Sequence, residues 1–320
     1  MSVLIYTELS EGQYKKTSIE AIYYGAQVAK QLGVDAKVLA IGEATADALA
    51  TAGTFGATSV LHASGADLGQ QNIMAYGQLV VAAVKASGAT VVVSAKSSLG
   101  DAVTARAAGA LKAGLVSNVV ELPDTSAGFS VKRSIFTGKA FAQTTISSDI
   151  KFLAIKKNVV TPEENGAPCG VESFSADVAS ALASSKVTET IKASGAVSLP
   201  EADLVVSGGR GMKGPDSWQP LLDLAEALGA ATACSKPVSD LDWRPHHEHV
   251  GQTGVKVAPN LYIACGISGA IQHLAGVNSS KVIVVINKDP EAPFFKAADY
   301  GIVGDVFDVL PKLTAAVKAM

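Results

Sequence analysis

The first half of the chain alternates short apolar stretches with longer stretches that repeat apolar residues at helical spacing. Continuous apolar runs are typical of buried parallel strands, and a 3.6-residue repeat is typical of amphipathic helices. The alternation therefore predicts a parallel sheet with helices on both faces. The predicted strands are Val3–Thr7, Lys37–Ile41, Ser59–His62 and Thr90–Ser94. The predicted helices are Ile19–Leu32, Asn72–Ala86 and Asp101–Ala113, with C-cap glycines expected at Gly33, Gly88 and Gly114.

Between residues 116 and 155 the pattern changes to alternating apolar and polar positions. Val131–Phe136 and Ala140–Ile146 flank Thr137-Gly138-Lys139, which predicts a hairpin and further strands added to the first sheet. Residues 158–200 then hold several prolines and glycines and a serine-rich stretch. We interpret this segment as a connection, with a domain boundary near residue 195.

After this boundary the alternation of strands and helices begins again. The predicted strands are Leu204–Ser207, Ala231–Cys234, Leu261–Cys265, Lys281–Ile286 and Tyr300–Val303. The predicted helices are Pro220–Leu228, ended by Gly229, then Ala270–Ala275, closed by Gly276, and a terminal helix that starts at Pro311 after a short turn capped by Asp305. Residues 238–258 are expected to be irregular.

This order of elements predicts an α/β protein with two domains, residues 1–195 and 196–320. Each domain is expected to hold a mainly parallel sheet flanked by helices, and the C-terminal one to be doubly wound. A length of 320 residues suits two domains, and an apolar content of 48% suffices for two cores.

Composition and charge exclude several classes of protein. The net charge of −3 gives no basic surface for nucleic acid. No apolar run approaches the roughly 20 residues of a membrane helix, so we expect no membrane insertion. The first residues are typical of a strand rather than of a signal peptide. Cys169, Cys234 and Cys265 are widely spaced, which disfavours a disulfide framework or a zinc ribbon and fits a reducing cytoplasm; Cys234 and Cys265 lie in predicted strands and are expected to be buried.

Small, polar or glycine residues follow each strand of the second half, as at the ligand edge of an open α/β sheet. Gly208-Gly209-Arg210-Gly211 matches neither the Rossmann nor the Walker spacing. It is either a tight turn with an exposed arginine or a turn whose arginine binds phosphate. Lys236 follows the next strand, and is either a surface lysine or a second cation facing a polyanionic ligand.

The segment 261–286 predicts a compact βαβ unit. Ser268 and Gly269 lie at the start of its helix, where backbone N–H groups and the helix dipole favour an anion. His273 lies in the same helix, and its sequence context fits a core or surface residue as well as a ligand contact. His246, His247 and His249 are too closely spaced for a helical metal pair, so we expect no metal. The absence of hydrolase motifs favours a carrier.

Five stretches of the second half resemble the alpha subunit of electron transfer flavoproteins. They are Ser207-Gly208-Gly209-Arg210-Gly211, Gln252-Thr253-Gly254, the run from Leu261 to His273, Ile286-Asn287-Lys288-Asp289-Pro290 and Asp299-Tyr300-Gly301-Ile302-Val303. The first half is similar to the family more loosely, as a domain that helps to form a heterodimer.

The resemblance implies that the C-terminal domain is a FAD-binding fold. The expected contacts are Arg210, Ser235, Lys236, Val250, Gly251, Gln252, Thr253, Ser268, Gly269, Ala270, Ile271, Gln272, His273, Asn287 and Asp305. In the family, the residue matching Thr253 hydrogen-bonds flavin N5, and the residue matching His273 lies near flavin O2. The turn from Ser268 to His273 serves the ribityl and phosphate groups, and Asn287 and Asp305 match positions at the adenosine end.

One position departs from the family pattern. After the position of Ser235 the family usually has an arginine packed against the flavin ring, where this chain has Lys236. Lysine keeps the charge but lacks the planar fork of arginine. We expect FAD still to bind, with altered one-electron potentials.

The resemblance also implies a function. The chain is expected to be an electron carrier rather than an enzyme with its own substrate. It would take electrons from flavoprotein dehydrogenases, such as the acyl-CoA dehydrogenases of fatty acid beta-oxidation, to a membrane quinone oxidoreductase. Its expected partner is a beta subunit that binds AMP.

Three other functions remain open at this point. They are a bifurcating form whose beta partner holds a second flavin, a nicotinamide-dependent dehydrogenase, and a nucleotide-binding regulatory module. The missing dinucleotide fingerprint and the missing proton-transfer pair disfavour the dehydrogenase.

Overall fold

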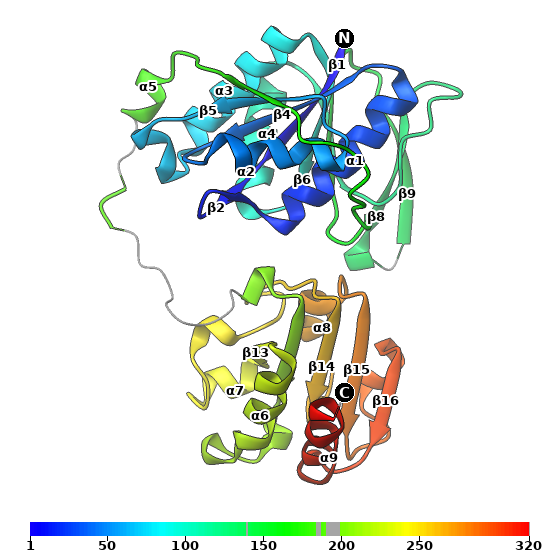
Figure 1. The fold of residues 1–320 in the computed structure, drawn as a ribbon. Coiled ribbons are helices and arrows are strands. Elements are labelled where there is room, and N and C mark those ends of the chain that lie inside the picture. The colour runs from blue at the N-terminus through cyan, green and yellow to red at the C-terminus, as the bar shows by residue number, and fades with distance from the viewer. Residues whose placement is uncertain (139, 184–186, 190–198, 320) are drawn as a thin grey trace. The chain divides into compact units, whose positions relative to one another are not determined.

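The structure is a computed structural model that describes residues 1–138, 140–183, 187–189 and 199–319. The chain divides into two compact units, Met1–Thr190 and Ile191–Met320 (Figure 1). The domain boundary expected near residue 195, the turn residue Lys139 and part of the serine-rich stretch lie outside the described residues.

The described part of the N-terminal unit is built on a nine-stranded sheet in the order β11-β5-β4-β1-β6-β10-β7-β8-β9. Neighbouring strands run parallel, except that β8 pairs antiparallel with both β7 and β9. The predicted parallel sheet and hairpin are therefore confirmed. The strands are β1 (Ser2–Thr7), β4 (Asp35–Ile41), β5 (Ser59–Ala63), β6 (Ala89–Ala95), β7 (Gly114–Val119), β8 (Ser130–Ile135), β9 (Ala140–Thr145), β10 (Lys151–Ile155) and β11 (Gly170–Ser173), with a separate pair β2 (Leu9–Ser10) and β3 (Gln13–Tyr14).

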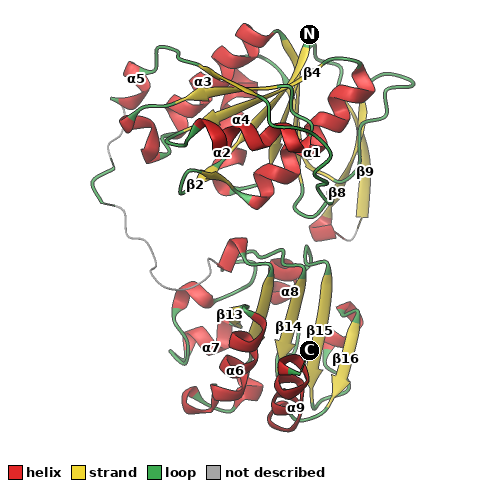
Figure 2. Ribbon diagram, viewed as in Figure 1, coloured by secondary structure: helices red, strands yellow, loops and turns green. Residues whose placement is uncertain are grey.

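Helices cover both faces of this sheet (Figure 2). They are α1 (Lys16–Leu32), α2 (Ala46–Ala50), α3 (Ile73–Ser87), α4 (Ser98–Ala110) and α5 (Ala179–Leu182). Because side chains alternate along a strand, Val3 and Ile5 of β1 share a core with α1, whereas Leu4 and Tyr6 share one with α3 and α4. Gly33, which ends α1, is left-handed with a φ of 66°, as predicted for a C-cap.

Two predictions for this unit are wrong. Helix α4 begins early because the Ser97 hydroxyl accepts a hydrogen bond from the Gly100 N–H at 2.7 Å. Lys112 takes the left-handed turn after the helix, with a φ of 52°, so Gly114 starts β7 instead of capping α4. The segment interpreted as a connection also supplies β11. It reaches the sheet because Gly53 lacks a Cβ, which would lie 2.3 Å from the Ala167 carbonyl oxygen.

The C-terminal unit holds five described strands in the order β13-β12-β14-β15-β16, all parallel. The chain turns from one side of β12 to the other, which makes the sheet doubly wound, as predicted. The strands are β12 (Leu204–Gly208), β13 (Ala231–Cys234), β14 (Leu261–Cys265), β15 (Val282–Asn287) and β16 (Tyr300–Val303). The helices are α6 (Gln219–Leu228), α7 (Lys236–Asp240), α8 (Ile271–Val277) and α9 (Val306–Lys318).

Each face of this sheet has its own core. Val206 and Ile263 pack with apolar residues of α6 and α9, and Val205 and Tyr262 pack with α8 and the loops beside it. Gly229, with a φ of 62°, ends α6 as predicted.

The stretch 238–258, expected to be irregular, holds the end of α7 and a 3-10 turn, His246–Glu248, and two helix boundaries also differ from the prediction. Helix α9 begins at Val306 because the Asp305 carboxylate accepts a hydrogen bond from the Phe307 N–H at 3.0 Å, and Pro311 lies inside it. Buried Leu310 holds this part of the helix against the sheet despite the proline. Gly276 lies inside α8 rather than after it. Glycine is needed there for a close contact, because a Cβ would be 2.6 Å from the Gly251 nitrogen.

Candidate functional site

The strands of the C-terminal unit end at one edge of the sheet, as the arrowheads of β14, β15 and β16 show in Figure 1. The predicted FAD contacts lie in the segments at this edge. Arg210 follows β12, Ser235 and Lys236 follow β13, and the turn from Ser268 to His273 follows β14. The change of direction beside β12 is where open α/β sheets bind ligands.

Glycines bring the turns after β12 and β14 into backbone contact. The Gly209 N–H donates to the Cys265 carbonyl at 2.9 Å, and the Gly211 N–H donates to the Gly266 carbonyl at 3.0 Å. A Cβ at Gly209 would lie 2.3 Å from the Gly266 oxygen. The glycines are therefore needed for a tight turn, and Arg210 between them is exposed to solvent.

Besides exposed Lys288, which follows β15, three cations lie at or near this edge. Lys236 begins α7 and is exposed, as is Arg210, and neither has an ion-pair partner among the described residues. The third cation is Lys213, which sequence analysis missed; its Nζ lies 3.1 Å from the Asp305 carboxylate. Asp305 thus caps α9 and pairs with a lysine, and its hydrogen bond from Phe307 together with Lys213 lowers its pKa.

The predicted segment Val250–Thr253 lies in a loop held from two sides. The Val250 N–H donates to the Cys234 carbonyl at 3.0 Å, and the Gln252 N–H donates to the Gln272 carbonyl at 2.7 Å. Gly251 packs against Gly276 of α8. Val250 and Gly251 are buried, whereas the side chains of Gln252 and Thr253 face solvent, where a ligand can reach them.

An ion pair that sequence analysis missed holds the chain just before this loop. Arg244 Nε and Nη2 donate to the two carboxylate oxygens of Glu248 at 2.8 and 2.6 Å. Thr232 of β13 also donates to this carboxylate, and the guanidinium lies 5.3 Å from the ring centre of Trp218. In the sequence, the spacing of four residues between Arg244 and Glu248 could have indicated this ion pair. The segment lacks a helical pattern, so the spacing was not taken as a signal. Glu248 is therefore engaged, and the described residues contain no cluster of three or more potential metal ligands.

His273 lies inside the unit and not on its surface. Its Nε2 is 2.9 Å from the Tyr262 hydroxyl, and its side chain is 7% exposed. Burial, helped by the nearby His249, lowers the pKa of His273 to about 4, so its imidazole is neutral at pH 7.

The rest of the predicted site lies around this histidine. Gly269 has a φ of 82° and packs against Phe294, while Ser268, Ala270, Ile271 and Gln272 are exposed, Ile271 by 59%. Asn287 ends β15, and its amide donates to the Ile267 carbonyl at 3.0 Å. The structure therefore gathers the predicted residues at one edge, with the side chains of Asn287 and Asp305 already engaged in internal bonds.

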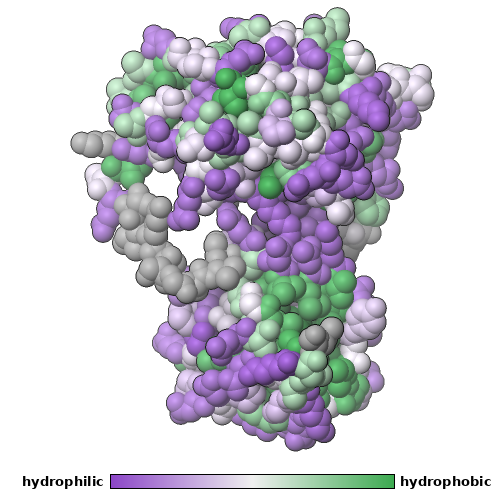
Figure 3. All heavy atoms as spheres, viewed as in Figure 1, coloured by the Kyte–Doolittle hydropathy of each residue, from purple (hydrophilic) through white to green (hydrophobic). Residues whose placement is uncertain are grey.

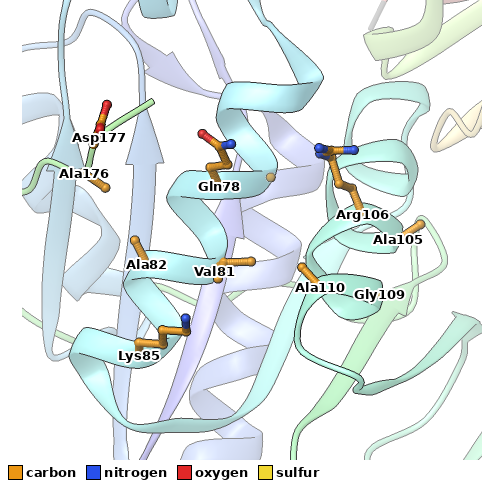
Figure 4. A pocket seen from close by; sticks show the side chains of 11 residues that line it. Gln78, Val81, Ala82, Lys85, Ala105, Arg106, Gly109, Ala110, Ala176 and Asp177 are labelled. Atoms are coloured by element: carbon orange, nitrogen blue, oxygen red, sulfur yellow. The ribbon is translucent and has the colours of Figure 1, made fainter. Parts of the chain in front are cut away.

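Each unit also has one other surface feature. A hollow of about 650 Å³ lies between α3 and α4, with Gln78, Lys85 and Arg106 around it (Figure 4). The last strand of the C-terminal unit exposes apolar side chains, with Tyr300 at 67% and Val303 at 61%, and Figure 3 shows hydrophobic residues gathered on one face of this unit. Exposed apolar surface of this kind is typical of contacts with other proteins.

Both units match sequence models of known domains. Residues 3–181 match the electron transfer flavoprotein domain, and residues 198–278 match the electron transfer flavoprotein FAD-binding domain. The predicted contacts from Arg210 to His273 fall inside the second match, whereas Asn287 and Asp305 fall outside it. The class of protein defined by the fold and the site is therefore that of electron transfer flavoproteins.

Individual relatives match over nearly the whole chain. The electron transfer flavoprotein subunit alpha of Bacillus subtilis is 36% identical over 99% of this chain and 98% of its own. That of Pseudomonas aeruginosa is 38% identical over 99% and 100%, and protein FixB of Clostridium saccharobutylicum is 34% identical over 99% and 96%. The chain belongs to the family of electron transfer flavoprotein alpha subunits, which confirms the resemblance noted in the sequence.

A solved structure of a thiamine diphosphate-dependent decarboxylase from Rhodococcus jostii covers the chain with a TM-score of 0.26, too low to relate the folds. None of the described helices has the length and apolar character needed to cross a membrane.

Proposed function

We propose that this chain is the FAD-carrying alpha subunit of a heterodimeric electron carrier. FAD binds at the carboxyl edge of the C-terminal sheet, and a beta subunit that binds AMP completes the protein. The heterodimer takes electrons from flavoprotein dehydrogenases, such as acyl-CoA dehydrogenases, and passes them to a membrane quinone oxidoreductase. It works in the cytoplasm and has no substrate of its own.

One observation carries this proposal: the strand ends and the loop at Val250–Thr253 place cations, hydroxyls and amides at a single edge. Exposed Arg210 and Lys236 offer positive charge to the flavin, and exposed Thr253 and Ser268 offer hydroxyl groups. In the same unit the buried Nδ1 atoms of His249 and His273 have no hydrogen-bond partner in the described part of the chain. Buried polar atoms without partners are expected where a ligand completes the site. The residues therefore fit FAD.

Bound FAD would supply the redox chemistry by accepting and releasing electrons. The chain contributes positive charge near the group that becomes reduced. About 1.4 kcal/mol of preferential stabilisation corresponds to ~60 mV for a one-electron couple. Since His273 is neutral at pH 7, this charge comes from Arg210 and Lys236 and not from the imidazole.

The visible spectrum and the potentials of the heterodimer test the proposal. Coexpression with the beta subunit should give one FAD per heterodimer, and an acyl-CoA dehydrogenase with its substrate should reduce it. Arg210→Ala and Lys236→Ala should lower the one-electron potentials, because each removes a positive charge from the edge. Lys30→Ala, an exposed lysine of α1, is the control and should leave them unchanged.

Other outcomes are distinct. A colourless heterodimer that binds AMP or a nicotinamide nucleotide alone would contradict the proposal. Two flavins per heterodimer would instead indicate the bifurcating form.

Lys236→Arg tests the departure from the family pattern. Arginine adds a planar, delocalised cation that can stack on a ring, so the two one-electron potentials should move while FAD content stays constant. Potentiometry of the two proteins measures this, and identical couples would show that Lys236 does not contact the flavin.

A further inference from the structure

A buried hydrogen bond joins Tyr262 in the middle of β14 to His273 in α8. The hydroxyl oxygen and Nε2 are 2.9 Å apart, and Tyr262 is fully buried. The ring centres of Tyr262 and Phe294 lie 6.1 and 5.7 Å from that of the imidazole and 6.5 Å from each other, so the three rings pack as one cluster. The imidazole is therefore held in one orientation, and its two nitrogens have different surroundings.

In this bond the phenol is the donor. Burial raises the pKa of Tyr262 far above its usual value, so the hydroxyl keeps its proton. A buried hydroxyl proton needs an acceptor. Among the described residues, Nε2 of His273 is the group within hydrogen-bond geometry of this hydroxyl; the Ser207 hydroxyl lies near enough to oppose part of the rise in the Tyr262 pKa but outside hydrogen-bond geometry. Nε2 must therefore offer its lone pair.

The other ring nitrogen then carries the proton of the neutral imidazole. Nδ1 is buried and has no hydrogen-bond partner in the described chain. The Val250 backbone lies close enough to the ring to raise the pKa of His273, which offsets part of the lowering by burial. It makes no hydrogen bond of normal geometry with Nδ1. An unpartnered N–H next to the segment Val250–Thr253 indicates a ligand acceptor at this position.

We propose that Tyr262 is a positioning residue that holds His273 as the Nδ1–H tautomer, so that the imidazole presents a neutral donor to a flavin oxygen. This rests on the proposed function, since it requires FAD at this edge. A neutral donor with Nε2 already engaged takes up no proton when the flavin is reduced. Electron transfer by this chain is therefore not coupled to protonation of His273.

Tyr262→Phe tests the proposal, because it removes the hydroxyl and keeps the ring. Nitrogen-15 NMR of histidine-labelled heterodimer should show Nδ1 protonated and Nε2 unprotonated for His273 in the wild type at pH 8. In Tyr262→Phe the signals should move toward a mixture of the two tautomers. FAD content should remain, and the first one-electron potential should fall, since fewer molecules present the Nδ1–H donor.

Tyr6→Phe is the matched control. Tyr6 is 2% exposed in the N-terminal unit, and its hydroxyl has no hydrogen-bond partner among the described residues, so its loss should change neither readout. A wild-type His273 protonated on Nε2, or an unchanged tautomer in Tyr262→Phe, would overturn the proposal. The tautomer is also measurable without FAD. A wild-type heterodimer that binds no flavin but shows the Nδ1–H tautomer would therefore contradict the proposed function and leave the assignment of the hydrogen bond intact.

Discussion

In the C-terminal unit, exposure decides whether a polar side chain can carry an unpaired charge. Exposed side chains can, whereas buried ones are either paired or neutral. Arg210 and Lys236 are in water and stay charged at little cost. Glu248 is buried and is paired with Arg244, and His273 is buried and neutral. Burying an unpaired charge is expensive, so these are the states that folding permits.

The neutral state of His273 predicts how stability depends on pH. Its pKa is about 4 in the folded chain and about 6.5 when unfolded, so protons favour the unfolded state. The neutral imidazole thus contributes on the order of 3 kcal/mol to the free energy of unfolding. This contribution is complete above pH 6.5 and is lost as the pH falls toward 4. Between pH 7 and 4, the free energy of unfolding of the FAD-free wild-type chain should therefore fall by more than that of His273→Gln, as measured by urea unfolding.

The control for this comparison is His247→Gln, which changes an exposed histidine. It should follow the wild type through the whole pH range. Parallel curves for the wild type and His273→Gln would show that the imidazole is not buried in solution.

Sequence could identify residues of the site whose role depends on position along the chain. Arg210 and Lys236 each follow a strand, and parallel strands end at one edge, so their convergence was predictable. The state of His273 was not, because its partner Tyr262 lies in a different element and the hydrogen bond depends on side-chain packing. Whether each predicted residue contacts FAD stays a prediction.

The loop that carries Val250–Thr253 illustrates how an irregular element is fixed. Its sequence lacks a helical or strand pattern, and just before it the Arg244–Glu248 pair spans a single 3-10 turn, His246–Glu248. Both side chains are largely buried, with exposed fractions of 22% and 9%. The pair anchors the loop to β13 through Thr232 and to the ring of Trp218.

Arg244→Met should destabilise the C-terminal unit by about 3 kcal/mol, because it leaves the Glu248 carboxylate buried and unpaired. The double variant Arg244→Met/Glu248→Leu should recover most of this loss, since it removes the charge as well as its partner. Urea unfolding followed by tryptophan fluorescence measures both.

An exposed ion pair provides the comparison. Lys132 and Glu121 lie 2.5 Å apart with side chains 37% and 58% exposed, so Lys132→Met should cost less than about 1 kcal/mol. A cost for Arg244→Met as small as this would mean that the loop is held by its backbone bonds alone.

At the scale of elements, sequence predicted what depends on local pattern and failed where distant contacts decide. Most strands of both sheets and the caps at Gly33 and Gly229 follow from apolar runs and glycine chemistry. At Gly114 and Gly276 a glycine was wrongly interpreted as the end of a helix. Gly276 instead allows a close contact with Gly251, and Gly114 begins a strand. Pro311 was wrong because Asp305 starts the helix before it.

At the scale of the whole molecule, the two units have separate cores on separate sheets. Each sheet is covered on both faces by helices of its own unit, and the proposed FAD site is built from residues of the C-terminal unit. A ligand that binds one unit should stabilise that unit and leave the other unchanged. The doubly wound architecture followed from the order of elements, whereas the β11 strand did not, because a short polar strand in a segment rich in proline and glycine has no apolar pattern.

The distribution of tryptophan makes this separation measurable. Both tryptophans, Trp218 and Trp243, lie in the C-terminal unit, so their fluorescence reports its unfolding alone, whereas far-UV circular dichroism reports both units. FAD at one hundred times its Kd should stabilise the C-terminal unit by about 2.7 kcal/mol. The fluorescence midpoint in urea should therefore rise, while the part of the dichroism transition that belongs to the N-terminal unit stays in place. If both probes instead followed a single transition that moved as a whole with FAD, the two units would unfold cooperatively and the separation of their cores would not extend to their stability.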